Sequence, residues 1–314
     1  LQEVVRPWEV ILRQISPGRL GARMDYLQVN GILLYREHWS HRVVATGATP
    51  AGFFFFGGPS VRKLQVAWCG NEVGSGCLAF GRPSTEIDFV TPDNETHICL
   101  LVPETLMLRY LGEELAPRVL PNGRVLSCQQ GCGARLLHMM ERILDNYLVH
   151  RELLAEKQIC QAIEWQLLGG LLELLLTRTG ETGCLRPSVR YQAVLRAIRI
   201  CDRARQSITV QELADASGVS VRVLELGFQE VAQSTPQQFM RRNRMNRVRR
   251  ELLAACRDTA TVTKIAGSYG VTELGRFAVD YKKLFGESPS ATFSRSILVP
   301  PHRMIDVLSG SPDA

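Results

Sequence analysis

The last third of the chain contains one short pattern twice, and this repeat constrains the fold more than any other feature. The two copies are ELADASGVSVRVLELGFQEVAQSTPQQF and KIAGSYGVTELGRFAVDYKKLFGESPSATF. Each copy has an alanine four residues before a glycine and an aromatic ring eight residues before a proline. The equivalent alanines are Ala214 and Ala266. A small residue, a tight turn and a second helix are typical of a helix-turn-helix unit. Two copies predict an all-α domain with two such units.

Side chains that can cap helix N-termini mark where the helices of this domain should begin. Thr209 with Glu212 and Thr235 with Gln238 can each form a capping box, in which the two side chains satisfy two free backbone N–H groups. Further N-caps are expected at Ser220, Thr261, Thr272 and Ser288.

Between the two units, PQQFMRRNRMNRVRRELLAA (236–255) is predicted to form one helix with six arginines between Arg241 and Arg250. Such a helix of about 20 residues is about 30 Å long. Major-groove faces on one side of B-DNA recur about every 34 Å, so the helix could place the units in neighbouring grooves. We expect some of these arginines to pair with acids and hold the units together. The alternative is a solvated basic face.

The positive charge of the chain is concentrated in the same region. The formal net charge is +6, but residues 1–186 carry 18 Lys and Arg against 19 Asp and Glu. Residues 187–314 carry 19 against 12, a net charge of +7. A basic domain joined to a nearly neutral one is typical of a protein that binds a polyanion such as nucleic acid.

The first part of the chain has a different texture. Seven short apolar segments between residues 24 and 102, separated by Gly, Pro, Asn and Asp, predict a β-sandwich or barrel. Four consecutive rings, Phe53 to Phe56, predict a strand buried on both faces, because neighbouring side chains point to opposite sides. Between 134 and 176 the apolar spacing becomes helical. These helices could pack on the β-rich part or pair two subunits, and both interpretations stay open.

These patterns predict an α+β chain of two domains. The stretch TRTGETGCLRPS is rich in Thr and Gly and should be the linker. The predicted parts are a first domain over 1–176 (β-rich 1–126, helical 134–176), the linker over 177–188, a domain of two helix-turn-helix units joined by a long helix over 189–298, and a tail over 299–314.

The segments ITVQELADASGVSVRVLELGF, MRRNRMNRVRRELL and GRFAVDYKKLFGESPS resemble the C-terminal DNA-binding domain of the AraC/XylS family of bacterial transcription regulators. The resemblance covers roughly residues 188–298. It implies that two recognition helices lie in successive major grooves of double-stranded DNA, and that the first domain senses a small-molecule effector or mediates dimerisation. It also implies an activator rather than a repressor, a homodimer, and contact with RNA polymerase.

Carried onto this sequence, the resemblance assigns residues to each recognition helix. Arginine can pair with guanine, glutamate can accept from cytosine, and leucine can meet a thymine methyl group. Lys282 and Lys283 come later in the second helix and suit phosphates. Residues expected to be core by their helical spacing are Leu224, Phe228, Leu274, Phe277 and Tyr281. Residues expected to face bases are Val221, Arg222, Glu225, Leu226 and Gln229 in the first helix, and Glu273, Gly275, Arg276 and Val279 in the second.

Three positions depart from the family pattern. Gln233 stands where the first unit usually has glycine, and Leu226 stands where the first recognition helix often has arginine or another polar residue. Val271 replaces the usual aromatic residue after the turn glycine. The first two departures make the contact pattern of the first unit uncertain, and the third is a mild change in packing.

The β-rich texture of the first domain is compatible with the cupin-like barrel that many family members carry. Phe53, Phe55 and Trp68 could line a pocket for the effector, or they could simply fill the core, and the sequence does not decide between these. His38 and His41 would point to opposite faces of a strand, so they are poor metal ligands. Cys128, Cys132 and His138 lack the spacing of a zinc site. No metal or other cofactor is predicted.

Nothing in the sequence indicates an enzyme: G-x-S-x-G, P-loop and dinucleotide-binding motifs are missing. The nine cysteines are scattered without a CxxC pair, and no basic-then-apolar signal precedes the first strand. We therefore expect reduced, buried thiols in a bacterial cytoplasm. The apolar run from Leu167 to Leu176 is too short to span a bilayer, so no membrane partner is expected.

Two other functional classes remain. The chain could be an enzyme or ligand-binding protein whose basic tail binds nucleic acid without sequence preference, or a helical adaptor whose basic face meets an acidic protein. Discrimination between base sequences would separate the first of these from a regulator. Failure to bind duplex DNA at low salt would favour the second.

Overall fold

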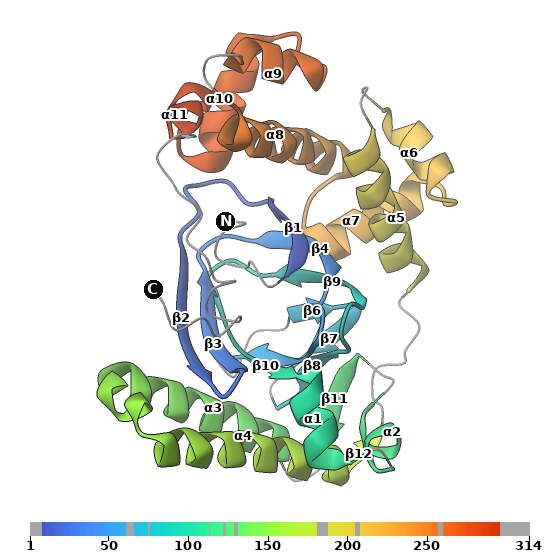
Figure 1. The fold of residues 1–314 in the computed structure, drawn as a ribbon. Coiled ribbons are helices and arrows are strands. Elements are labelled where there is room, and N and C mark those ends of the chain that lie inside the picture. The colour runs from blue at the N-terminus through green and yellow to red at the C-terminus, as the bar shows by residue number, and fades with distance from the viewer. Residues whose placement is uncertain are drawn as a thin grey trace.

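The structure is a computed structural model of the chain, shown in Figure 1. The described residues are 8–60, 66–74, 76–112, 114–121, 124–128, 131–180, 188–204, 208–256 and 260–295.

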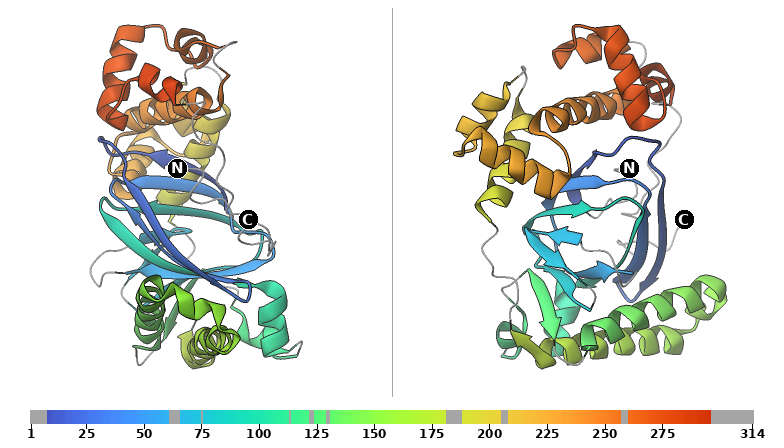
Figure 2. Two further views of the ribbon diagram at one scale, coloured as in Figure 1. Left: turned by 60° about the vertical axis from the view of Figure 1, so that its left-hand side comes forward. Right: turned by 180° about the vertical axis from the view of Figure 1, so that it is seen from behind.

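Two antiparallel sheets face each other and form a β-sandwich (Figures 1 and 2). The predicted α+β fold with a β-rich first part is confirmed. The strand before residue 24, β1, is an addition to the predicted segments. The five-stranded sheet has the order β1 (Glu9–Gln14), β4 (Val43–Ala48), β9 (Glu86–Thr91), β6 (Val66–Trp68) and β7 (Asn71–Val73). The seven-stranded sheet has the order β12 (Arg178–Gly180), β11 (Val125–Cys128), β8 (Leu78–Gly81), β5 (Phe53–Pro59), β10 (Glu95–Pro103), β3 (Ile32–Trp39) and β2 (Ala22–Val29).

The phenylalanine strand is buried on both faces, as predicted. Phe54 and Phe56 belong to the apolar cluster between the seven-stranded sheet and the helices outside it. Phe55 points the other way, into the cluster between the two sheets, and half-buried Phe53 packs against that same cluster. The alternation follows from the period of two along a strand, and it explains why one strand needs large side chains on both sides.

Helices cover the outer face of the seven-stranded sheet, and in Figure 1 they lie on the side of the sandwich opposite the C-terminal helices. Ile163, Leu167, Leu171 and Leu174 of the last helix are buried there. This helix is long and apolar enough to cross a membrane by length and composition alone, and one of its faces packs in the core cluster. The helices are α1 (Glu104–Leu111), α2 (Ala116–Val119), α3 (Cys132–Val149), the 3-10 helix η2 (Arg151–Ala155) and α4 (Lys157–Thr177).

Two regions differ in part from expectation. Arg178–Gly180, within the expected linker, form β12 and pair with β11, while residues 181–187 of that stretch lie outside the described residues. Cys132 is disulfide-bonded, so the expectation of reduced thiols throughout is wrong at this position. Six other described cysteines are free thiols, at positions 69, 77, 99, 160, 201 and 256.

The C-terminal helices form two units with separate cores, and the long α8 contributes to both. Its residue Phe239 packs in the first core, and Met245, Val248 and Leu252 pack in the second. The prediction of one long helix between the units is confirmed. The helices are α5 (Val189–Arg203), α6 (Val210–Ala216), α7 (Val221–Ala232), α8 (Pro236–Ala254), α9 (Val262–Ser268), α10 (Leu274–Phe285) and α11 (Pro289–Ser294).

Most of the predicted helix starts are confirmed. Both capping boxes form, at Thr209 with Glu212 and at Thr235 with Gln238. The exception is Thr272, because α10 begins at Leu274, with Glu273 at its N-cap position and no side-chain cap bond. Thr272 therefore lies one residue too early to cap the helix. The N-caps that accept the expected backbone hydrogen bond are Ser220, Thr261 and Ser288.

The conformation of Gln233 shows what its departure from the family pattern changes. This residue ends α7 in the left-handed conformation, with a φ of 46°. This region favours glycine, because a Cβ atom crowds the backbone there. The departure therefore changes the strain of the turn and leaves its shape unaltered.

The sandwich is joined to the C-terminal helices by the end of β1. Arg13, which is fully buried, forms an ion pair with Asp202 and donates from Nε to Asn243 Oδ1 at 3.1 Å. One residue later, the Gln14 N–H donates to Asn246 Oδ1 at 3.0 Å, and Asn246 Nδ2 donates back to the Gln14 carbonyl at 2.8 Å. A short polar stretch of β1 thus bonds directly to two asparagines on one face of α8.

A second contact places α5 on the outer face of the five-stranded sheet. Ile15, Val44 and Val90 share one apolar cluster with Val194 and Ile198 of α5. The C-terminal end of α10 also contacts the sandwich, since Gln14 Nε2 donates to the Leu284 carbonyl at 2.7 Å. Both helix-turn-helix units therefore contact the sandwich.

Replacing Asn246 by Ala should loosen the contact between β1 and α8, because the backbone N–H and C=O of Gln14 lose their buried partners. The expected cost is about 1–3 kcal/mol, so the Gln14 amide should exchange with solvent roughly 10- to 100-fold faster. Hydrogen-exchange mass spectrometry measures this. Gln237→Ala, on the exposed side of the same helix, is the control, and unchanged exchange in Asn246→Ala would contradict the role of this side chain.

Gln233→Gly should stabilise the first unit by about 1 kcal/mol, because it relieves left-handed strain. Gly218→Ala should destabilise the same unit by a similar amount, because Gly218 has a φ of 71°, which strains any residue with a Cβ atom. The space around an added Cβ is open, so a steric clash does not contribute. Thermal unfolding followed by circular dichroism compares the two. Shifts of the same sign would show that backbone strain does not control these turns.

Candidate functional site

The helix expected to be the first recognition helix, α7, is positioned by its buried face. Leu224 and Phe228 are fully buried, and Phe228 packs on Phe239 of α8 with ring centroids 5.0 Å apart. A Cβ atom on Gly227 would come within 3.0 Å of the Arg190 carbonyl, so glycine allows α7 to approach α5 closely. These contacts turn the opposite face outward. Arg222, Glu225, Leu226 and Gln229 are all exposed on it, and Val221 is half-buried.

The second recognition helix, α10, is built in the same way. Phe277 and Tyr281 are buried, and the Tyr281 hydroxyl donates to Thr292 of α11 at 2.9 Å. The core prediction is wrong for Leu274, which is 38% exposed because it occupies the first position of the helix, outside the packed stripe. The side chains expected to face bases are exposed: Glu273, Arg276 and Val279, with Gly275 beside them.

Local electrostatics leave Arg276 available. Its guanidinium lies 3.9 Å from Glu273, and both side chains are about two-thirds exposed. Such a pair contributes little in water, so a stronger anion could replace it. Lys282 and Lys283 are exposed in the last turn of α10. This exposed face therefore carries cations at both ends and an apolar residue, Val279, between them.

Most arginines of α8 are used inside the molecule. Arg249 forms an ion pair with Glu287 and lies over the Phe285 ring, 4.7 Å from its centroid. Arg247 donates to the Cys201 carbonyl at 3.0 Å. Arg241 pairs with Asp280 of the second unit. The expectation that some of these arginines pair with acids and hold the units together is confirmed.

The remaining arginines of α8 face partly inward. Burial lowers the pKa of Arg242, Arg244 and Arg250 below the ordinary arginine value. Atom Nη1 of Arg250 is buried, with no hydrogen-bond partner in the described part of the chain. The basic run is therefore mainly structural, and the exposed cations of α7 and α10 are better placed to meet a ligand.

A cleft between the two units was missed by sequence reasoning. Its volume is about 660 Å³, and it is lined by both units and by α8. The lining includes Gln238, Arg241, Glu273 and Arg276. The cleft forms because α8 holds two segments that are about 60 residues apart in the sequence, around Thr209 and Thr272, across from each other, which no local pattern could indicate.

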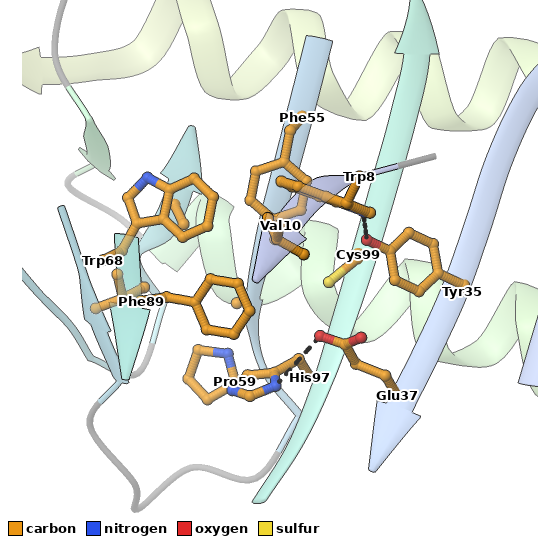
Figure 3. Close-up of a pocket in the computed structure, with 14 residues that line it drawn as sticks. Trp8, Val10, Tyr35, Glu37, Phe55, Pro59, Trp68, Phe89, His97 and Cys99 are labelled. Carbon is orange, nitrogen blue, oxygen red and sulfur yellow. Dashed lines mark hydrogen bonds and ion pairs between the residues drawn. The ribbon is translucent and has the colours of Figure 1, made fainter. Parts of the chain in front are cut away.

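The second candidate site is a cavity between the two sheets, called here the interior cavity (Figure 3). Its volume is about 50 Å³. Of the expected pocket residues, Phe55 and Trp68 line it, whereas Phe53 does not. Sequence reasoning missed Trp8, Tyr35 and Phe89, which come from strands far apart along the chain. The remaining lining residues are Val10, Glu37, Gly57, Gly58, Pro59, Val73, Ala79, His97 and Cys99.

Two ionisable side chains meet at the edge of this cavity. His97 Nδ1 lies 3.8 Å from Glu37 Oε1, and both side chains are about nine-tenths buried. Burial raises the pKa of Glu37 to about 7 and lowers the pKa of His97 to about 4, with a smaller contribution to the latter from His38. Neither ring nitrogen of His97 has a hydrogen-bond partner among the described residues.

The other histidines mentioned above have ordinary polar partners. His38 Nδ1 lies 3.0 Å from the Thr96 hydroxyl, and His41 Nδ1 lies 2.8 Å from that of Ser40. Within the described ranges, no group of three His, Cys, Asp or Glu residues is placed to hold a metal ion.

Comparison with known proteins identifies the C-terminal helices. Residues 213–295 match a helix-turn-helix domain family. Over 124 residues the chain is 31% identical to XylDLEGF operon transcriptional activator 2 of Pseudomonas putida, which covers 40% of this chain and 78% of that protein. It is 44% identical over 87 residues to the probable thc operon regulatory protein of Rhodococcus erythropolis, covering 28% of this chain and 26% of that protein.

Among solved structures, a probable AraC family transcriptional regulator from Rhodopseudomonas palustris CGA009 is 34% identical. The match covers 33% of this chain and 96% of that one, with a TM-score of 0.30. The chain thus shares its helix-turn-helix region with these relatives and spans only about a quarter of the thc operon regulatory protein. With 31% identity over more than three quarters of the Pseudomonas putida activator, the chain belongs to the AraC/XylS family of transcriptional regulators.

Proposed function

We propose that this protein is a sequence-specific regulator of transcription that reads two successive major grooves with α7 and α10. The observation that carries the proposal is the pair of exposed helix faces on two units joined by the 19 residues of α8. The axis of α8 is about 28 Å long, close to the roughly 34 Å between neighbouring grooves on one side of B-DNA. The net charge of +7 over residues 187–314 favours binding to a polyanion.

Each exposed residue has a role that its chemistry supports. Arg222 and Arg276 pair with guanines, and Glu225 or Glu273 accepts from a cytosine amine. Leu226 contacts a thymine methyl group, Gln229 and Val279 complete the two faces, and Gly275 lets the backbone come close. Lys282 and Lys283 bind phosphates and set the register.

Regulation would depend on the first domain. The similar protein of Pseudomonas putida is a transcriptional activator, which supports activation by contact with RNA polymerase in the bacterial cytoplasm. The interior cavity would hold a small-molecule effector. Because Val10 of β1, with Trp8 directly before the strand, lines the cavity, and Arg13 and Gln14 at the end of β1 contact α8, this strand would connect effector binding to the DNA-binding units.

A homodimer would form through α4. Trp165, Gly169, Leu172 and Leu176 are spaced along one side of this helix, and Trp165 and Leu176 are 62% and 59% exposed. Gly169 has open space where a Cβ would stand. The helix packs on the sandwich with one face, so this second apolar face is available for another subunit.

Binding of the full chain to a randomised duplex library, at two salt concentrations, tests the DNA-binding proposal. Enrichment of two boxes about one helical turn apart is expected. Binding that weakens with salt and enriches no sequence would instead favour a basic surface without sequence preference on an enzyme or ligand-binding protein.

Arg276→Ala should lower affinity for the enriched site by about 1–3 kcal/mol and relax the preference at one base pair. Lys282→Ala should weaken binding to all sequences alike and reduce the slope of log K against log salt by about 0.9. Titrations on the enriched site and on single-base variants distinguish these outcomes. If Arg276→Ala weakened every sequence equally, the arginine would be a phosphate contact.

Trp165→Glu should convert the dimer to a monomer, because it removes a large apolar contact and buries a charge in the interface. The dissociation constant should rise roughly 100-fold or more. Sedimentation equilibrium measures this. Gln166→Glu, which adds the same charge at the next, also exposed position, should leave the dimer intact. A wild-type chain that stays monomeric at micromolar concentration would rule out this interface.

A further inference from the structure

Aromatic rings surround most of the interior cavity. Trp8, Phe55 and Trp68 form a continuous group, with ring centroids 4.8 Å apart from Trp8 to Phe55 and again from Phe55 to Trp68. Phe89 stacks on Trp68 at 6.1 Å, and Tyr35 lies across from them. In Figure 3 these rings are arranged around an open centre. Five of the fourteen described residues that line the cavity therefore present Trp, Phe or Tyr rings to it.

The polar edges of these rings are already occupied. Trp8 Nε1 donates to the Tyr35 hydroxyl at 3.0 Å, and Trp68 Nε1 donates to the Phe80 carbonyl at 3.1 Å. At these rings a ligand would thus meet mainly carbon atoms, whereas the ring nitrogens of His97, which have no hydrogen-bond partner among the described residues, also reach the cavity. Ring faces carry partial negative charge, which attracts cations and repels anions.

The charged groups of the wall point to the same class of ligand. None of the fourteen described residues that line the cavity is Lys or Arg, and one, Glu37, is a carboxylic acid. An anion entering this site would lose its hydration without gaining a cationic partner. Glu37 is buried against neutral His97 at 3.8 Å, too far for a direct hydrogen bond. A cation placed beside this carboxylate would stabilise its ionised form.

The volume limits what can enter the centre. A water-sized group needs about 10–15 Å³ of such space, so a cavity of about 50 Å³ holds roughly four of them. This matches a small ammonium head, with any longer part of the molecule directed away from the ring.

We propose that the interior cavity binds a small organic cation, a protonated or quaternary amine, with its ammonium group between the aromatic rings and the Glu37 carboxylate. This inference rests on the proposed role of the cavity as the effector site and names the chemistry of that effector.

Three probes of matched shape test the class: tetramethylammonium, uncharged tert-butanol and anionic pivalate. Isothermal titration of the full chain measures their affinities, and tryptophan fluorescence reports on the cavity because Trp8 and Trp68 line it. Tetramethylammonium should bind at least tenfold more tightly than either of the others. Equal or tighter binding of tert-butanol or pivalate would overturn the proposal, as would no binding of tetramethylammonium.

Glu37→Gln should weaken tetramethylammonium binding at least tenfold and leave tert-butanol unaffected. The matched control is Glu95→Gln, since Glu95 is also a fully buried acid on a strand of the same sheet but does not line the cavity. If Glu95→Gln weakened binding as much as Glu37→Gln, the effect would be structural, and Glu37 would have no direct role.

The pH dependence provides a second readout. Cation binding favours the ionised form of Glu37, whose pKa in the free protein is raised to about 7 by burial, so affinity should fall as the pH decreases through 7. Of the groups around Glu37, His97 has a pKa lowered to about 4, and burial raises the pKa of Tyr35 and Cys99 well above their ordinary values. Glu95, on the same face of β10 as His97, also has a pKa raised to about 7, so the titration is repeated with Glu95→Gln, in which the pH dependence should persist. Affinity that is flat from about pH 6 to about pH 8 would contradict the proposal; these limits are about 1 unit to either side of the Glu37 pKa.

The duplex-library experiment keeps the two conclusions separate. An enriched operator without tetramethylammonium binding would remove only the ligand class. Cation binding without any enriched sequence would remove the regulatory function and leave a cation-binding protein.

Discussion

The burial of the Arg13 guanidinium between β1 and α8 is the constraint on which the relative placement of the two domains depends. The side chain is fully buried, and its partners are Asp202, Asn243, Thr46 and the Ile11 carbonyl. A buried charge without partners costs several kcal/mol, so it keeps this position only while the C-terminal helices supply Asp202 and Asn243. Since the next residue, Gln14, bonds to Asn246 and Leu284, a stretch of two residues aligns both helix-turn-helix units with the sandwich.

This constraint also explains how the arginines of α8 are distributed. The sequence alone indicates a basic rod, and six arginines in ten residues look like a surface for phosphates. In the folded chain, one side of the rod packs on the sandwich and another on the second unit, so Arg247 and Arg249 bond to carbonyl and carboxylate oxygens instead. Such bonds hold the two units at a fixed separation. For a protein that reads two grooves, rigidity of this connection matters more than additional charge, because both helices must meet their grooves at once.

Local patterns predicted much of the fold, and contacts between distant segments account for what they missed. Capping boxes, the repeated turn and the two-sided phenylalanine strand follow from chemistry within a few residues, and each is present. The predictions for Thr272 and Leu274 were wrong because α10 starts one residue later in its copy of the repeat than α7 does when Ala214 is aligned with Ala266. Phe55 and Trp68 were identified as pocket residues, but Trp8, Tyr35 and Phe89 were not, because they become their neighbours only when the start of β1, β3 and β9 are assembled. The exposed faces of α7 and α10 were predictable, since helical period separates them from buried Phe228 and Phe277.

The position of β1 gives the two proposals a common physical basis. Trp8, directly before β1, and Val10 in it line the cavity, whereas Arg13 and Gln14 at the other end of the strand bond to α8. A strand is stiff along its length, so a change in packing at Trp8 is transmitted to Arg13 unless the strand bends. A ligand shifts an equilibrium only by its difference in affinity for the two states. On the proposed mechanism, an ammonium group that draws Trp8 toward the ring of aromatics would favour one setting of β1, and with it one spacing of α7 and α10. Because the buried Arg13 network tolerates few geometries, the response would be a switch between discrete arrangements rather than a gradual displacement.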